Sequence, residues 1–396
     1  MSWKEVKPMD EKVKFIADFL RGGMPFKTLC GLYEISRKTG YKWVERYQKA
    51  GIDGLTEQSR RPHFSCVTPY VVSQAILELR LYKGDVLGAK KIQALLASRF
   101  EQALIPSQTT IYNILKNAGC ITPRRKVRKT PRGIKPLSTA LQANQLWTVD
   151  YKGQFRMKNG HWCYPLTVMD HASRYLLACT GFSSTRTEDA IEVFENLFRQ
   201  YGLPSRIRSD NGVPFASTGV GGLSKLSIWW IKLGIIPERI DPGKPQQNGR
   251  HERMHRTLKR RIGQPGASDL EAQQVQLDEF RWHYNHERPH ESLEQKLPCD
   301  FYTHSIRQYP DKLLEIEYPK HFMRAKVCQS GLIYWRALRV YIGYLLHREW
   351  VGLELVGDGI WDVYFGPIRL GTLDERQATG PLKDYLTLKV SPMSVK

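Results

Sequence analysis

The chain has 396 residues, a quarter of them charged, and a formal net charge of +21 at pH 7. That length allows two to four domains with sizeable cores, and so large a positive charge favours a polyanionic partner such as nucleic acid. The sequence has no signal peptide and no apolar run of about 18 residues, which excludes a membrane-spanning protein.

The positive charge is concentrated in the first third of the chain. Residues 1–141 hold 26 Lys and Arg against 11 Asp and Glu, so +15 of the +21 lies there. Phosphate neutralisation by this segment would give a salt-dependent affinity for DNA or RNA. The alternative is a basic protein without a nucleic-acid partner.

The seven cysteines are scattered along the chain, without Cys-x₂-Cys pairs or Cys/His knuckles. This pattern indicates neither a zinc site nor a disulfide framework. Free thiols in a reducing cytosol are the simplest interpretation, and we expect a cytoplasmic, nucleoid-associated protein.

Residues 9–50 have the apolar spacing of three short helices. Ser36 is a predicted N-cap for the third helix, residues 37–47. The set resembles a helix-turn-helix domain over residues 1–52, whose last helix would enter the major groove; a plain three-helix bundle is the alternative. The predicted DNA contacts are Arg37, Lys38, Thr39 and Lys42.

A second helical set is predicted over residues 66–120, after a Gly- and Pro-bounded linker at residues 50–62. Its third helix begins near Pro106 and has Ser107 as its N-cap. The same helix-turn-helix interpretation applies, and two tandem units suit a protein that grips a long duplex. The predicted contacts are Ser107, Gln108, Thr109 and Tyr112.

Residues 121–143 form a predicted basic linker. Its central stretch, residues 122–136, holds seven Lys and Arg and no acidic residue. Such a segment cannot bury a core, so it either lies along the phosphates or in the minor groove, or acts as a solvated tether. The candidate contacts are Arg124, Arg125, Lys126, Arg128 and Lys129.

From Asn144 the pattern changes to strands and helices in alternation. Three strands are expected at residues 145–157, 162–169 and 175–180. A helix at residues 187–201, capped by Thr185 or Thr187, then precedes strands and helices in turn. Three antiparallel strands followed by helix and strand in alternation are typical of an α/β ribonuclease-H-like core, here over residues 144–300.

Three acidic residues fall at special places in this core. Asp150 lies within a strand, Asp210 ends a strand before an Asn-Gly turn, and Glu252 lies in the first turn of a very basic helix. Singly, Asp210 reads as a turn former and Glu252 as a charge-balancing residue. Together, three carboxylates can hold two divalent cations about 4 Å apart for in-line attack at a phosphodiester.

Trp147-Thr-Val-Asp150, Ser209-Asp-Asn-Gly212 and Pro245-Gln-Gln-Asn-Gly-Arg-His-Glu252 resemble the signature blocks of the retroviral-integrase-like insertion-sequence transposases, the Asp-Asp-Glu recombinases. The resemblance implies Asp150, Asp210 and Glu252 as metal ligands for two Mg²⁺, with Mn²⁺ as a substitute. One departure is the spacing of 41 residues between the last two acids, where the family has about 35. We expect the surplus in a flexible surface loop at residues 217–222.

Other polar residues near the acids have simpler interpretations. Asp170 and Asp241 are expected to form loops. His251 and His255 are read as surface or phosphate-contacting residues, since Mg²⁺ prefers oxygen ligands. The residues expected to contact DNA near the cut are Gln247, Asn248, Arg256 and Lys259.

The chain ends in a region rich in Val, Tyr, Trp, Ile and Gly. After a helix at residues 268–286 and a closing block at residues 285–292, residues 319–378 are predicted to form a small five-stranded β-barrel similar to that of integrases. It would bind DNA or a second protomer, or serve only as a stabilising appendage. The candidate contacts are Arg336, Arg339 and Arg348.

These observations predict a transposase that binds the inverted repeats of a mobile element, frees 3′-OH ends and joins them to target DNA. Its partners would be double-stranded DNA and other copies of itself, as a dimer or tetramer. Two alternatives remain from the sequence: a catalytically silent DNA-binding regulator, and a nuclease acting on RNA–DNA hybrids.

Overall fold

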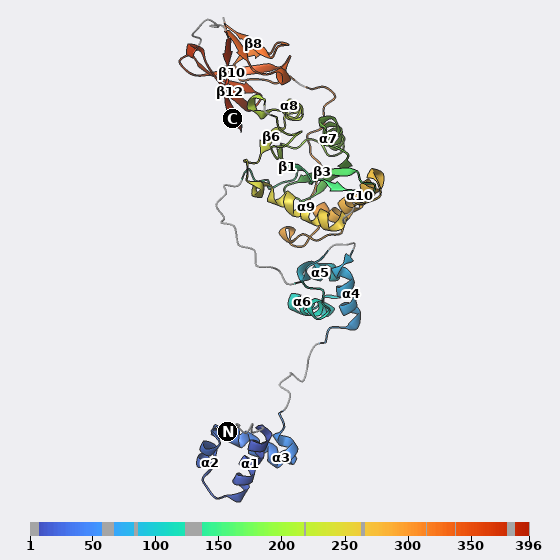
Figure 1. The fold of residues 1–396 in the computed structure, drawn as a ribbon, viewed down its shortest axis with the longest axis vertical. Coiled ribbons are helices and arrows are strands. Elements are labelled where there is room, and N and C mark those ends of the chain that lie inside the picture. The colour runs from blue at the N-terminus through green and yellow to red at the C-terminus, as the bar shows by residue number, and fades with distance from the viewer. Residues whose placement is uncertain are drawn as a thin grey trace. The chain divides into compact units, whose positions relative to one another are not determined.

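The computed structural model describes residues 8–57, 67–82, 86–122, 137–217, 219–262, 266–313, 315–336, 338–377 and 385–395. The chain divides into two compact units, Met1–Val67 and Thr68–Lys396, whose elements are labelled in Figure 1. The predicted linker contacts Arg124, Arg125, Lys126, Arg128 and Lys129 lie outside the described residues.

The first unit contains the three expected helices: α1 (Pro8–Arg21), α2 (Phe26–Leu32) and α3 (Arg37–Ala50). Ser36 caps α3, since its Oγ accepts a hydrogen bond from Thr39 N at 3.1 Å. A 3-10 turn, η1 (Gly51–Leu55), follows. Leu55 is 1% exposed in the core of this unit, so the linker predicted from residue 50 begins too early.

The second helical set consists of α4 (Tyr70–Arg80), α5 (Ala89–Leu96) and α6 (Gln108–Asn117). Ser107 caps α6 as predicted, accepting from Thr110 N at 3.3 Å. The helices share one apolar core, in which Ile76, Ile92 and Ile111 are completely buried. The exposed start of α6 therefore remains free to contact a ligand.

A six-stranded sheet forms the centre of the next domain. Its strands are β1 (Trp147–Tyr151), β2 (Phe155–Arg156), β3 (Trp162–Asp170), β4 (Leu176–Phe182), β5 (Arg206–Ser209) and β6 (Ile236–Arg239). The order is β2-β3-β1-β5-β6, with β4 paired to β3; the first three long strands are antiparallel, and β1, β5 and β6 are parallel. The single strand expected at residues 145–157 is interrupted at residues 152–154.

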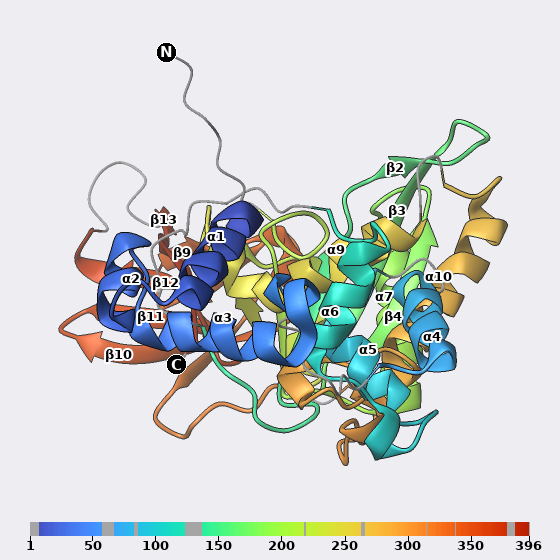
Figure 2. The same ribbon diagram turned by 90° about the horizontal axis from the view of Figure 1, so that it is seen from below.

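Helices cover both faces of this sheet (Figures 1 and 2). One apolar core joins the sheet to α7 (Thr187–Tyr201) and α8 (Lys225–Lys232). Another joins it to α9 (Gly249–Ile262) and α10 (Leu270–His286), which runs along β4. The N-cap of α7 is Arg186, without a side-chain cap, so the predicted Thr cap is wrong.

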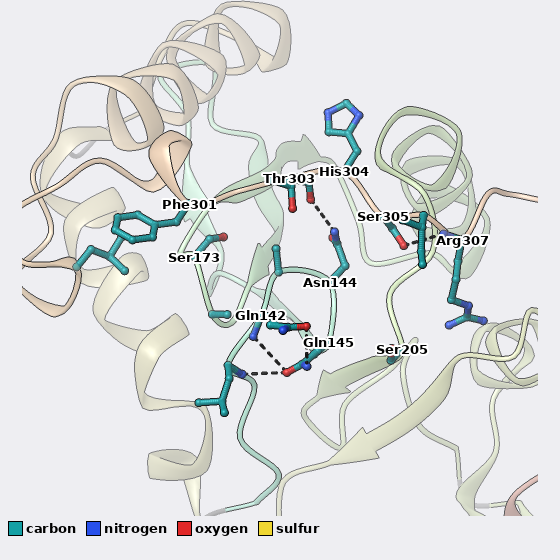
Figure 3. A pocket seen from close by; sticks show the side chains of 15 residues that line it. Gln142, Asn144, Gln145, Ser173, Ser205, Phe301, Thr303, His304, Ser305 and Arg307 are labelled. Carbon is teal, nitrogen blue, oxygen red and sulfur yellow. Dashed lines mark hydrogen bonds between the residues drawn. The ribbon is translucent and has the colours of Figure 1, made fainter.

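The closing block after α10 has the structural role expected of it. Asn285 Oδ1 accepts from Leu176 N at 2.8 Å, and its Nδ2 donates to Leu176 O at 3.0 Å. The chain then returns past the start of β1, where Asn144 Nδ2 donates to Thr303 O at 2.7 Å. A hollow lies here, lined by Asn144, Ser205 and Thr303 among others (Figure 3). It therefore lies at the strand starts, away from Asp150 and Asp210.

Eight strands follow in the described C-terminal residues: β7 (Met323–Lys326), β8 (Leu332–Trp335), β9 (Leu338–Tyr341), β10 (Trp350–Gly357), β11 (Ile360–Phe365), β12 (Ile368–Asp374), β13 (Tyr385–Thr387) and β14 (Lys389–Val395). They form a five-stranded sheet, β14-β12-β11-β10-β7, and a three-stranded sheet, β13-β9-β8. The predicted five-stranded barrel ending at residue 378 is therefore wrong in strand number and boundary.

The segment expected to hold the surplus residues, 217–222, packs against this C-terminal β-domain in its described part. The turn η4 (Val220–Gly222) contains a buried Gly221 with φ +61°, where an added Cβ would lie 3.0 Å from Leu370. Leu223 and Ile231 belong to the same apolar core as the strands. In its described part, the segment at 217–222 is therefore a docked turn and not the flexible surface loop expected.

Within the described ranges, no helix combines the length and apolarity needed to cross a bilayer. The six cysteines in those ranges carry free thiols, as expected.

Candidate active site

The register of two parallel strands aligns the first two acids. Trp147 pairs with Ile207 and Thr148 with Arg208. Continuing this register by two residues brings Asp150 level with Asp210, which directly follows the end of β5. Adjacent strands lie about 4.8 Å apart and side chains alternate between faces, so both carboxylates project from the same side of the sheet.

The third acid comes from α9, which packs on that side. The helix buries His251, Met254, His255, Leu258 and Ile262 against the sheet and α10, while Glu252 in its first turn is exposed. Burial, the Asp210 carboxylate and the Glu252 carboxylate, in that order, raise the pKa of Asp150 to about 7. Asp150 is therefore close enough to both other predicted acids for their charges to act on it.

The donor set fits a divalent cation, since three carboxylates offer the oxygen ligands that Mg²⁺ prefers and a cation would relieve their repulsion. The fit is incomplete, however. In the described part of the chain, no three His, Cys, Asp or Glu side chains already stand close enough together to hold a metal ion. The exposed Glu252 side chain would therefore have to close onto the metal.

The two histidines of α9 do not lie on the surface, so that prediction is wrong. His251 is 0% and His255 9% exposed. Their Nε2 atoms both lie 2.7 Å from Thr167 Oγ1, and His251 Nδ1 lies 2.9 Å from Thr148 Oγ1. The spacing of 251, 254, 255, 258 and 262 is that of a buried helix face, and this signal was available in the sequence.

The hydrogen bonds of Thr167 determine which ring nitrogens of His251 and His255 carry the proton. Thr167 Oγ1 donates its single proton to Asp150 O at 2.9 Å, so both Nε2 atoms must donate to Thr167. His255 Nδ1 then faces Asp150 Oδ2 at 3.6 Å. Burial lowers the pKa of His255 to about 3, so this contact is not a charged pair. The cluster fixes α9 on the strand that carries Asp150.

Arg208 connects the segment that carries Asp210 with the segment that carries Glu252. The sequence analysis did not single out this residue. Its side chain is 3% exposed and forms an ion pair with Glu238 of β6 at 2.8 Å. It also donates to Gln247 O at 3.1 Å and to Ser138 O at 2.5 Å. One guanidinium thus ties the strand before Asp210 to the turn before Glu252.

That turn, η5 (Pro245–Asn248), holds two of the predicted DNA contacts. Gln247 Nε2 donates to Asp241 Oδ2 at 3.0 Å, and its Oε1 accepts from Asp241 N at 2.6 Å. Asn248 is 6% exposed. A buried amide cannot reach a base, which is a correction for Asn248. Asp241 forms this loop as expected.

The remaining predicted contacts lie on exposed helix surfaces. Arg256 and Lys259 are exposed on the side of α9 that carries Glu252. Arg37, Lys38 and Lys42 are exposed on α3, whereas Thr39 is half-buried and bonds to Ser36. Trp43 is 6% exposed, as expected of a core residue. Ser107, Gln108, Thr109 and Tyr112 are exposed at the start of α6.

Asp170 forms the turn after β3, as expected. It is completely buried; its Oδ1 accepts from Asn144 N at 2.8 Å and its Oδ2 from Ser173 N at 2.8 Å. Burial raises the pKa of this carboxyl, and the hydrogen bonds oppose the rise. Among the C-terminal candidates, Arg336 pairs with Glu375 at 3.2 Å and lies over the Trp361 ring.

Four family models match the chain. Two models described as integrase core domain match residues 140–245 and 233–298. A helix-turn-helix domain model matches residues 11–63, and a homeodomain-like domain model matches residues 39–115. The matches thus cover both helical sets and the sheet that carries the acids.

Curated relatives include proteins of insertion elements and of retroviruses. An uncharacterised 31.7 kDa protein of insertion element IS407 from Burkholderia multivorans is 24% identical, covering 58% of this chain and 80% of that protein. An insertion element IS476 protein from Xanthomonas euvesicatoria is 23% identical over 54% of this chain and 60% of its own length. The Gag-Pol polyprotein of baboon endogenous virus is 28% identical over 39% of this chain, which spans only 8% of that polyprotein.

Solved integrase structures are similar at low identity. A simian T-cell lymphotropic virus intasome in complex with a PP2A regulatory subunit matches 70% of this chain and 96% of its own chain, with 18% identity and a TM-score of 0.35. The HTLV-2 integrase catalytic core in complex with magnesium matches 42% of this chain and 100% of its own, with 14% identity and a TM-score of 0.33.

These structural likenesses are weak, and the family assignment rests on the domain models and the sequence relatives. With helix-turn-helix-type domains and an integrase core in one chain, and insertion-element proteins among its relatives, this protein is similar to the integrase-like insertion-sequence transposases.

Proposed function

We propose that the protein cleaves the ends of its mobile element at a phosphodiester and joins the freed 3′-OH groups to target DNA, using Asp150, Asp210 and Glu252. The observation that carries this proposal is that Asp150 and Asp210 lie level on two parallel strands and that the Asp210 and Glu252 carboxylates both act on the buried Asp150. Repelling acids in a cationic protein are expected where a divalent cation binds.

The three carboxylates would hold two Mg²⁺, or Mn²⁺ in its place. When bound, such ions lower the pKa of an attacking water and neutralise charge on the phosphodiester. The chain's own part is positioning: Thr167 and the two buried histidines fix α9 against β1, and Arg208 fixes the turn before Glu252. Arg256 and Lys259 would hold phosphates next to the cut.

Binding would begin in the helical domains. Exposed polar residues at the starts of α3 and α6 would contact the element ends, and the basic residues 124–129 would follow the phosphates toward the core. We propose that the active form is a homo-oligomer, because two element ends must be joined to one target.

The proposal is tested with the Glu252→Gln variant and a labelled duplex carrying the element end. We expect duplex affinity within about twofold of wild type, because one exposed carboxylate contributes little to DNA binding. Mg²⁺-dependent cleavage and strand transfer should fall by at least about a thousandfold, because a ligand is lost.

The matched control is Glu271→Gln, since Glu271 is likewise an exposed acid in the first turn of a helix, α10. It should cleave like wild type. Retained cleavage by Glu252→Gln would overturn the proposal. A wild-type protein that binds the duplex but never cuts it in Mg²⁺ or Mn²⁺ would support the silent regulator.

A further inference from the structure

Two arginines of the core meet at one backbone carbonyl. Arg174 Nη1 and Arg250 Nη1 each donate to His171 O at 2.8 Å, so the two nitrogens are at most twice that distance apart. In the described ranges, neither guanidinium is within ion-pair distance of a carboxylate. Like charges this close are unfavourable unless a further group neutralises them.

The nearest acid cannot supply that neutralisation in full. Asp170 lies close enough to act on both arginines, but its carboxylate is completely buried and already accepts three hydrogen bonds, from Asn144 N, Ser173 N and Ser173 Oγ. Burial, and after it Arg250, lower the pKa of Arg174 to about 10. The positive charge of the pair is therefore poorly balanced by the protein itself.

Two further features mark this spot. Arg174 has φ +66°, a left-handed conformation that is strained for a residue other than glycine. The side chain of His171, 6% exposed, has its Nδ1 buried without a hydrogen-bond partner. Strain and an unsatisfied polar atom beside two cations are features of a binding site more than of a plain turn.

The site is reachable from solvent and continues along α9. Arg174 Nε donates to the exposed Ser292 Oγ at 3.3 Å. Arg253 and Arg260, both exposed, follow Arg250 on the same side of the helix, three and ten residues on. A row of guanidinium groups suits the successive phosphates of one DNA strand better than a single small anion.

We propose that Arg174 and Arg250 together bind one backbone phosphate of the DNA that the core acts on. This inference rests on the proposed function, since it names a contact to the same substrate. The bound phosphate would anchor the duplex beside the first turn of α9, which also carries Glu252.

The test uses the full chain with Arg174→Gln, Arg250→Gln and the double variant. Affinity for a random-sequence 30-base-pair duplex is measured across NaCl concentrations, with EDTA present so that cleavage plays no part. Each single variant should bind roughly three- to tenfold more weakly at 0.1 M salt. The slope of log Kd against log salt should decrease by about 0.9, the value for one phosphate, and the double variant should lose no more than a single one.

Arg199→Gln is the matched control, because it removes the same charge from α7 on the opposite face of the sheet. It should leave the salt slope unchanged. The melting temperature of Arg174→Gln should equal or exceed that of wild type, because a like-charge contact is relieved. A lower melting temperature with an unchanged slope would show that the arginines only brace the turn, and would overturn the inference.

The phosphate bound by the two arginines could belong to DNA or be a free anion, and a measurement with inorganic phosphate distinguishes these two sources. If phosphate raises the melting temperature of wild type but not of Arg174→Gln, and the duplex slope is the same for both, the site takes a free anion and the DNA assignment is wrong. Because no cleavage is measured, a changed slope in a protein that never cuts DNA would sink the proposed chemistry while leaving this contact standing.

Discussion

The carboxyl of Asp150 links pH to the proposed chemistry at the scale of one residue. Its pKa is raised to about 7 by burial and by Asp210 and Glu252, so the folded protein without metal holds a proton there that the unfolded chain releases at about 3.8. The metal-free fold should therefore lose stability as pH rises from about 4 through 7, because the unfolded state binds fewer protons in that window.

Metal binding should show the opposite dependence, because a ligand must be deprotonated. We expect the apparent affinity for Mg²⁺ to rise about tenfold per pH unit below pH 7 and to level off above it. His251 and His255 contribute nothing in this window, since burial lowers the pKa of each. The pH dependence of Mg²⁺ binding is measured as the shift in melting temperature caused by Mg²⁺ between pH 6 and 8.5.

The control for this titration is Asp150→Asn, which cannot hold the proton. It should show no Mg²⁺-induced shift and a flatter pH dependence of melting. A wild-type Mg²⁺ response that is constant from pH 6 to 8.5 would contradict the raised pKa.

At the scale of elements, the buried Arg208–Glu238 pair joins β5, β6, the turn η5 and the segment at Ser138. Arg208→Met should cost about 3–5 kcal/mol of unfolding free energy, because it leaves Glu238 buried without its charge partner. Urea unfolding followed by fluorescence measures the loss.

Arg206→Met is the comparison on the same strand, since Arg206 is exposed. It should change the unfolding free energy by no more than about 0.5 kcal/mol. Equal losses in the two variants would mean that the ion pair contributes little to holding these elements together.

At the scale of the whole molecule, the first unit and the C-terminal β-domain differ in their dependence on the rest. Residues 1–67 form a unit with its own core. The β-domain instead shares a core with Leu223, Ile228 and Ile231, all under 10% exposed. Lys232 also pairs with Glu349 at 2.7 Å.

Deleting residues 1–67 should leave the melting temperature of the remainder unchanged. Deleting residues 315–396 should lower the melting temperature of the remainder. The deletion would expose Leu223, Ile228 and Ile231, and each would lose about 1.5–3 kcal/mol of burial free energy. Calorimetry of both truncated proteins decides. An unchanged melting temperature after the C-terminal deletion would show that the shared core is not needed by the catalytic domain.

Much of this architecture follows from local pattern. Ser36 and Ser107 predict their helices because a capping hydroxyl acts on backbone groups within three residues. Asp150 and Glu252 stand out because a carboxylate in a strand and one among bases both break the local rule, which is expected at functional sites. Asp210 stands out only through the Ser209-Asp-Asn-Gly212 block. The glycines at 219–222 misled because glycines favour a surface loop locally, whereas Gly221 is buried by packing.

The sequence by itself determined the helices of the two helical sets, most helices and strands of the core, and the three candidate acids, because those properties depend on neighbours a few residues away. Only the tertiary structure decided that His251 and His255 both contact Thr167, that Arg208 and Gln247 meet, and that Arg174 and Arg250 share one carbonyl. Each of these contacts joins residues tens of positions apart, and their proximity is set by strand register and helix packing, which no local pattern encodes.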